Sequence, residues 1–366
     1  MTSLRSALKS ATALAAFSLS FPLASWAEEP LPVVATFSIL GDMVERIGGE
    51  HIALTTLVGP DGDAHVYQPT PKVARSVAEA DVLFLNGLEF EGWLERLAEA
   101  ASFGGAMVVA TKGVVPIAFD DHDDHDDHDD HDEHDDHDDH DDHDEHDDHD
   151  DHAEHDKHAD HDDHNDHDKH DDHDDHDEHD DHDDHAGHDH GAFDPHAWQS
   201  LENAVIYANN IAAGLAQADP ENAGDYYANR AAFITEVETL RADIGAMMKS
   251  LPADKRTVVT PHDAFGYFAA TYDLTFVAPQ GMSTDSEVSA ADVAALITQI
   301  REESISAVFI ESITDNRMMQ QIANETGATI GGTLYSDALS AQSGPASTYL
   351  DMMRHNATTL FDALGN

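Results

Sequence analysis

A long histidine–aspartate tract is the feature that most limits how this chain of 366 residues can fold. From His122 to His185 histidine recurs at every third position, mostly as Asp-Asp-His, and residues 120–190 hold 24 of the 29 histidines and 40 of the 75 acidic residues. The only aliphatic side chains in this tract are a few alanines, so it cannot bury a hydrophobic core and we expect it to be disordered. Folded structure must therefore form from the segments on either side.

The composition of the tract indicates metal binding. Neutral imidazoles among carboxylates chelate borderline divalent ions such as zinc, copper, nickel and cobalt. Because a mobile chain loses entropy when it orders around an ion, we expect many weak, exchangeable sites rather than one tight site. A purely solvating acidic segment is the alternative, but solvation alone does not require histidine at a period of three.

The charge of the chain argues against two classes of partner. The formal net charge is -58 at neutral pH, and the tract contributes most of it. Outside the tract and the first 27 residues, 35 acidic residues remain against 13 basic ones. This balance disfavours nucleic acid and anionic membrane surfaces as partners.

The N-terminal residues have the anatomy of a secretory signal peptide. Arg5 and Lys9 precede an apolar run over residues 11–23, and Ser-Trp-Ala precedes Glu28. The run is shorter than the roughly 20 residues that span a bilayer, so we expect cleavage of residues 1–27. The chain has no cysteine, which leaves only nitrogen and oxygen donors for a metal and no cysteine for lipid attachment. We expect a monomer without a stable membrane anchor, in the periplasm.

Strand and helix patterns alternate on both sides of the tract. Apolar runs such as 31–38 and 81–86 are separated by segments with helical spacing, which indicates a mainly parallel sheet. The same rhythm starts again with expected strands at 256–260 and 307–311, and it ends with an expected helix over 345–364. Between the two series, residues 220–250 have helical spacing throughout, enough for a helix of roughly 45 Å.

These patterns predict an α/β fold of two lobes. Each lobe has a mainly parallel sheet flanked by helices, and a long rigid helix joins the two. The expected boundaries are an N-terminal lobe over 28–219 that includes the tract, a connecting helix over 220–251, and a C-terminal lobe over 252–366.

Five histidines lie outside the tract. His51 begins an expected strand and His355 lies off the apolar stripe of the last helix, and most such histidines have no specific role. His65, His196 and His262 instead lie at expected strand-to-helix or loop junctions. Such junctions converge where open α/β sheets bind ligands. Each histidine taken alone is also consistent with a turn or cap.

Four motifs resemble those of the metal-specific substrate-binding proteins of ABC importers, most closely the zinc-binding ZnuA type. They are DAHVYQPT at 63–70, DPHAW at 194–198, HDAFGYF at 262–268 and LYSDALS at 334–340. The resemblance covers essentially the whole mature chain, and the order of the motifs, the histidine-rich insert and the long helix also agree with it.

The resemblance implies a metal site in the cleft between the lobes, with His65 and His196 from the first lobe and His262 and Asp337 from the second. Three imidazoles and one carboxylate suit tetrahedral zinc, and manganese-specific relatives have a carboxylate in place of the third histidine. A water molecule or a tract histidine is the alternative to Asp337, because some zinc-type relatives have a glutamate where this chain has Ala64. Two flanking acids, Asp194 and Asp263, are candidates for holding imidazoles or for capping local helices.

The predicted function is capture of zinc as cargo and its delivery to an ABC importer. The expected partners are a membrane permease and its cytoplasmic ATPase, and the tract would act as an accessory zinc collector or sensor. One alternative is binding of manganese or another divalent metal, and another is a periplasmic metal buffer or chaperone that works through the tract. A zinc hydrolase would need an open coordination position and a general base. Asp337 would close that position, so we predict that the protein is not an enzyme.

Overall fold

The computed structural model describes residues 29–118 and 192–365. The expected signal peptide at 1–27 and the histidine–aspartate tract at 120–190 lie outside the described residues. In the described ranges, no helix has the length and apolar composition needed to cross a bilayer.

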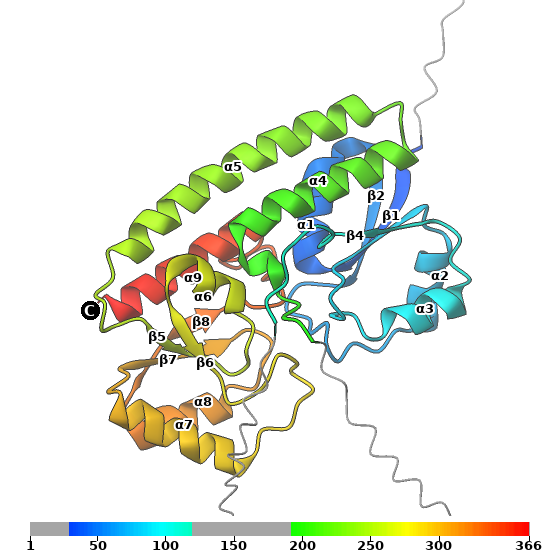
Figure 1. Ribbon diagram of the computed structural model, residues 1–366. Helices are drawn as coiled ribbons and strands as arrows, with labels where there is room; N and C mark the ends of the chain where they lie inside the picture. The colour runs from blue at the N-terminus through cyan, green and yellow to red at the C-terminus, as the bar shows by residue number, and fades with distance from the viewer. Residues whose placement is uncertain (1–28, 119–191, 366) are drawn as a thin grey trace, which may run out of the picture. The chain divides into compact units, whose positions relative to one another are not determined.

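The first lobe is built around a parallel sheet of four strands in the order β2-β1-β3-β4. In β1 the side chains from Val33 to Phe37 are all buried, as expected for a strand that is covered on both faces. Helices α1 and α4 pack together, and α2 packs against α3 (Figure 1). The elements are β1 Leu31–Phe37, α1 Ser38–Gly48, β2 Ile52–Val58, α2 Pro71–Ala78, β3 Val82–Leu85, α3 Leu94–Ala101, β4 Ala106–Val109 and α4 Leu201–Ala218, with short 3-10 turns η1 Gly49–His51 and η2 Ala197–Gln199.

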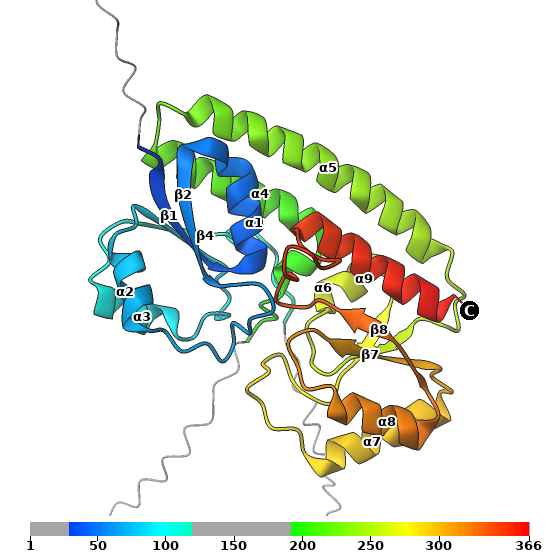
Figure 2. The ribbon, with the colours of Figure 1, turned by 180° about the vertical axis from the view of Figure 1, so that it is seen from behind.

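The second lobe repeats this design with a parallel sheet in the order β6-β5-β7-β8. Helices α7 and α8 lie together on one side of this sheet, while α9 and α6 lie on the side of α5 (Figure 2). The elements are β5 Thr257–Val259, α6 Gly266–Tyr272, β6 Thr275–Val277, α7 Ala290–Glu302, β7 Ala307–Glu311, α8 Arg317–Thr326, β8 Thr329–Leu334 and α9 Tyr349–Leu364.

Helix α5 (Ala223–Lys249) runs along both lobes. Its 27 residues span about 40 Å. It packs against α1 and α4 of the first lobe and against α6 and α9 of the second (Figures 1 and 2). Its buried side chains, from Tyr226 to Met248, belong to one hydrophobic cluster that also contains Val34 of the first sheet and Phe309 of the second. The lobes therefore share a continuous core.

The fold class expected from the sequence is confirmed, with two parallel sheets flanked by helices. Two expected helix starts are wrong. Helix α5 begins at Ala223 and not at Pro220, because the Asp219 carboxylate accepts hydrogen bonds from Asn222 and Tyr226 and holds the preceding residues in a turn. Helix α9 begins at Tyr349 and not at Pro345, because Thr348 is its N-cap and accepts from the backbone N–H of Asp351.

Candidate metal centre

The structure brings the three junction histidines and Asp337 together. His65 lies in the loop after β2, His262 lies just after β5, and Asp337 lies just after β8, so these three follow the carboxyl ends of parallel strands. His196 directly precedes η2. One nitrogen from each histidine and one oxygen from the carboxylate all lie within 4.8 Å of one another.

All three histidines direct Nε2 toward the carboxylate of Asp337. Nε2 of His65 and Nε2 of His262 each lie 3.1 Å from Oδ2, and Nε2 of His196 lies 3.6 Å from Oδ1. The side chains of His196, His262 and Asp337 are 0 % exposed, and that of His65 is 6 % exposed. The cluster is therefore a closed, nearly dry set of nitrogen and oxygen donors.

Two atoms of this cluster are better placed to coordinate a cation than to form a hydrogen bond with each other. Nε2 of His196 and Oδ1 of Asp337 are buried and have no hydrogen-bond partner. A buried polar atom without a partner costs about 1–3 kcal/mol, so such atoms need another function. A metal ion at the centre would coordinate both, and four donors of this kind suit tetrahedral geometry.

Carboxylates outside the cluster orient two of the imidazoles. Oδ1 of Asp194 lies 2.8 Å from both the backbone nitrogen and Nδ1 of His196. Nδ1 of His262 lies 2.6 Å from Oε2 of Glu311, close enough for an ion pair although the pair is not aligned as a regular hydrogen bond. In both cases the outer acid holds Nδ1 and leaves Nε2 to face the centre, as in many metal sites.

Sequence reasoning found one of these two supports and missed the other. Asp194 was one of the two flanking candidates. The other, Asp263, donates its backbone N–H to the carbonyl of Gly281, and the carboxylate that supports His262 comes from Glu311. Glu311 also accepts from the backbone N–H of His262 and from the Ser336 hydroxyl. The sequence does contain a pattern that could have identified Glu311, because this acid lies at the carboxyl end of a buried strand, where such sheets bind ligands.

Charge within the cluster moves the pKa values of its members. Burial lowers the pKa of His262, but Glu311 and Asp337 outweigh it and hold that pKa well above its ordinary value. For His196, burial is likewise outweighed by Asp337 and Asp194, and the pKa is raised. Burial raises the pKa of Asp337, but His262 and His196 together keep it well below its usual range. The raised pKa values of His196 and His262 mean that protons compete with a cation for these two imidazoles.

Aromatic side chains form the wall of the centre on the side of the first lobe. The Phe90 ring lies edge-on to His65 with centroids 4.9 Å apart, and the Trp198 ring lies 5.3 Å from that of His196. The indole N–H of Trp93 donates to the carbonyl of Ala64, beside the first histidine. The indole N–H of Trp198 donates to the carbonyl of Ser336, beside Asp337. These contacts pack aromatic rings against two donors and fix the backbone next to two donors.

The two remaining histidines outside the tract have structural partners. Nε2 of His51 lies 2.9 Å from Oδ2 of Asp225, and Nε2 of His355 lies 3.0 Å from the carbonyl of Thr333. Neither belongs to the donor cluster. Their geometry agrees with the interpretation that they support local structure.

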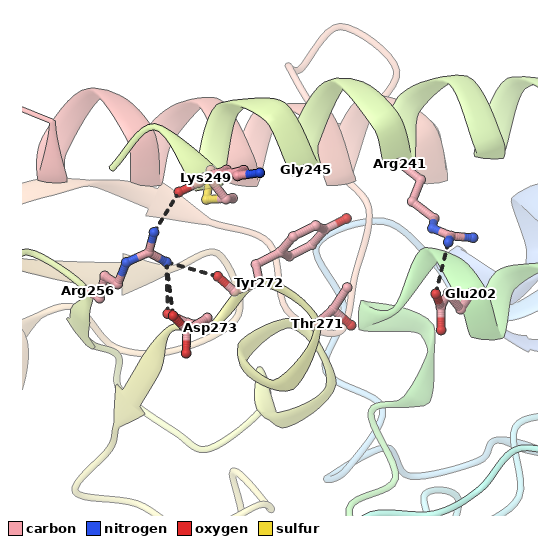
Figure 3. Close-up of a pocket in the computed structure, with 9 residues that line it drawn as sticks. Glu202, Arg241, Gly245, Lys249, Arg256, Thr271, Tyr272 and Asp273 are labelled. Carbon is pink, nitrogen blue, oxygen red and sulfur yellow. Dashed lines mark hydrogen bonds and ion pairs between the residues drawn. The ribbon is translucent and has the colours of Figure 1, made fainter. Parts of the chain in front are cut away.

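A separate pocket of about 410 Å³ lies between α5, the start of α4 and the end of α6, and none of the four donors lines it (Figure 3). Both arginines that line the pocket already have partners. Arg241 lies 3.1 Å from Glu202, and Arg256 donates to the carbonyls of Tyr272 and Asp273 (Figure 3). Arg256 also donates to the carbonyl of Met248 in α5, so these contacts bind α5 to both lobes and the pocket is best explained as part of the structural support.

Relatives of known type match almost the whole chain. The relatives include the manganese-binding lipoprotein MntA of Halalkalibacterium halodurans, 26% identical over 92% of this chain and 89% of that protein. The iron-binding protein YfeA of Yersinia pestis is 27% identical over 91% of this chain and 86% of that protein. The relatives thus carry names for different metals.

Solved structures match the fold. The periplasmic zinc-binding protein TroA from Treponema pallidum superposes with a TM-score of 0.71 at 23% identity, over 93% of this chain and 100% of that chain. A manganese-bound periplasmic metal-binding protein from Candidatus Liberibacter asiaticus gives a TM-score of 0.67 at 26% identity, over 91% of this chain and 98% of that chain.

A protein-family model described as zinc-uptake complex component A, periplasmic, matches residues 33–363. The match includes both lobes and all four donors of the cluster. The chain therefore belongs to the ZnuA family, the metal-binding substrate-binding proteins of ABC transporters.

Proposed function

We propose that this protein captures zinc in the cleft between its lobes and delivers it to an ABC importer. His65, His196, His262 and Asp337 are the proposed ligands. The observation that carries the proposal is the convergence of three Nε2 atoms on one buried carboxylate, with all four donor atoms within 4.8 Å. Zinc is the cargo in this proposal, and it does not take part in a reaction.

The donor set favours zinc over manganese. Three of the four donors are imidazole nitrogens, which suit zinc, whereas manganese prefers oxygen-rich sites with more ligands. The zinc-uptake description of the family model agrees with this choice. The relatives named for manganese and iron make another divalent metal the second candidate.

The proposal extends to location and partners. The signal-like N-terminus favours export to the periplasm, where a monomer would dock on a membrane permease whose cytoplasmic ATPase drives zinc release. The tract at 120–190 would collect zinc ions near the cleft through many weak sites. An enzymatic role has less support, because Asp337 occupies the fourth position that a hydrolytic zinc site keeps open for water.

The test is zinc titration by calorimetry at neutral pH. The proteins are the mature chain, a variant that lacks residues 120–190, and the same deletion combined with His65→Ala. The matched control is the deletion combined with His51→Ala, because His51 contacts Asp225 far from the cluster. We expect one tight site that survives the deletion and the control substitution and disappears with His65→Ala.

Three other results would contradict the proposed site, its ligands or the choice of metal. Loss of tight binding on deletion of the tract would favour the metal buffer or chaperone. Tight zinc binding that is unchanged by His65→Ala would show that the proposed set of four ligands is wrong. A parallel titration with manganese tests the choice of metal, since tighter binding of manganese than of zinc would favour the second candidate.

A further inference from the structure

Asp63 connects the loop that carries His65 to the opposite lobe. Its Oδ1 accepts from the backbone N–H of His65 at 2.9 Å. Its Oδ2 accepts from the hydroxyl of Thr284 at 2.6 Å, and Thr284 belongs to the second lobe. One carboxylate thus bonds to the backbone of a donor residue and to the other side of the cleft.

The segment around Thr284 is itself fixed to the third histidine. The side-chain amide of Gln280 donates to the carbonyls of Thr284 and Ser286, each at 2.7 Å, and shapes the turn between them. The backbone of Gln280 pairs with His262 in a parallel bridge and donates to the carbonyl of Pro261. The bond between Asp63 and Thr284 therefore completes a chain of contacts from His65 in one lobe to His262 in the other.

His65 is the least buried of the four donors. The other three donors have fully buried side chains, whereas His65 is 6 % exposed and its neighbour Val66 is 46 % exposed. His65 also lies on a loop between β2 and α2, while the second-lobe donors directly follow strands. Movement of this loop would open the centre on the side of its least buried donor.

We propose that Asp63 and Thr284 form a latch that holds His65 on the metal and sets the rate of metal release. The proposal rests on the proposed function, and Asp63 acts in it as a positioning residue, not as a ligand. The bond is short and its acceptor is a carboxylate, which makes it one of the stronger hydrogen bonds in proteins. The backbone N–H of Asp61 also donates to the carbonyl of Leu339 in the second lobe, and this hydrogen bond remains when Thr284 is replaced. Loss of the latch therefore loosens the part of the loop that carries His65, while Asp61 still holds the start of the loop to the second lobe.

The intrinsic fluorescence of the protein isolates the centre from the tract. Outside the first 27 residues the tryptophans are Trp93 and Trp198, and the tract contains none. Both indoles donate to backbone carbonyls next to proposed ligands. The probe is cobalt(II), a paramagnetic ion that quenches nearby indoles. The full mature chain is loaded with one equivalent of cobalt and mixed with excess chelator in a stopped-flow instrument.

The informative substitution is Thr284→Val, which keeps the shape of the side chain and removes the hydroxyl. We expect release to become about tenfold faster with an unchanged rate of binding. A tenfold change corresponds to about 1.4 kcal/mol, the scale of one hydrogen bond to a charged group. Thr284→Ser restores a hydroxyl and should bring the release rate back toward that of the original chain. The matched control is Thr298→Val on α7, whose hydroxyl donates only within its own helix.

A double-mutant cycle distinguishes loss of the bond between Asp63 and Thr284 from a general destabilisation of the structure. In an Asp63→Ala background, Thr284→Val should leave the release rate unchanged, because the bond is already gone. The latch is overturned if Thr284→Val releases cobalt at the original rate, or if it speeds release equally in the presence and absence of Asp63. If the unaltered chain shows no metal-dependent quenching, the proposed metal centre itself fails, and that outcome is separate from a failed latch.

Discussion

Glu311 offers a sharp test of how outer carboxylates tune the centre. It is 1 % exposed and its Oε2 lies 2.6 Å from Nδ1 of His262. Its other contacts are the backbone N–H of His262 at 3.2 Å and the hydroxyl of Ser336 at 2.6 Å. The substitution Glu311→Gln preserves the volume and one acceptor oxygen and removes the negative charge, so the imidazole stays in place with a less basic Nε2.

The expected loss in affinity follows from that change. Replacing a carboxylate that supports a metal-bound histidine typically weakens metal binding by roughly 10- to 100-fold. This range corresponds to about 1.4–2.7 kcal/mol. Calorimetric titration of the tract-deleted protein with zinc measures the effect directly. The control is Glu302→Gln, which removes an exposed acid at the end of α7.

The dependence on pH provides the stricter criterion. Glu311 is one of two carboxylates that raise the pKa of His262, so its removal lowers that pKa and weakens competition from protons. At high pH, where protons no longer compete, Glu311→Gln shows its full loss of zinc affinity. As the pH falls, protonation of His262 weakens zinc binding more in the original chain than in the Glu311→Gln variant. The difference in zinc affinity between the two proteins therefore narrows. A difference that stays constant from pH 5.5 to 8.5, or equal affinities throughout, would refute the reasoning.

Three other substitutions test packing and charge elsewhere. Gly245→Ala in the interior of α5 places a methyl group where nothing beyond the neighbouring backbone of the helix lies within 4 Å, so we expect a gain of about 0.5–1 kcal/mol in the free energy of unfolding, measured in denaturant. Gly266→Ala would put Cβ 2.4 Å from Oδ2 of Asp194, so it should weaken zinc binding where Gly245→Ala does not. Burial raises the pKa of Asp42 from 3.8 to about 6 despite a hydrogen bond from the backbone of Tyr349, so the cost of its ionisation to folding grows as the pH rises from about 4 to about 6 and is complete above that. Asp42→Asn should therefore gain stability relative to the original chain, by at most about 3 kcal/mol at pH 7.5 and not at all below pH 4, and an equal effect at both pH values would contradict this assignment.

The sequence predicts those parts of the fold that depend on local patterns. Alternating apolar runs and helical segments locate both sheets, and their junctions locate His65, His196 and His262. The helix starts at Pro220 and Pro345 are wrong because side chains three to seven residues apart decide them, as Asp219 does through Tyr226. Proline favours the first turn of a helix, but it does not require one.

Long-range partners are the part that no local pattern contains. Glu311 looks like any acid at the end of a strand until the fold brings it against a histidine 49 residues earlier. Thr284 lies 221 residues from Asp63, in a stretch of polar and small residues that resembles an ordinary loop. The contact of Glu311 appears only when the second lobe folds, and that of Thr284 only when the two lobes pack together. The tract is different, because its composition alone indicates metal contact and its residues lie outside the described structure.

The outer carboxylates give the centre two opposing properties. Asp194 and Glu311 make the imidazoles more basic, which strengthens their bonds to a metal and also strengthens their hold on protons. In the metal-free protein, the negative charge of Asp337 raises the pKa values of His196 and His262 and favours their protonated forms. A divalent cation competes with those protons, so binding should release protons and weaken as the pH falls. Release of the ion should then be favoured wherever protons can return to the imidazoles, and His65 is the donor nearest to solvent by exposure.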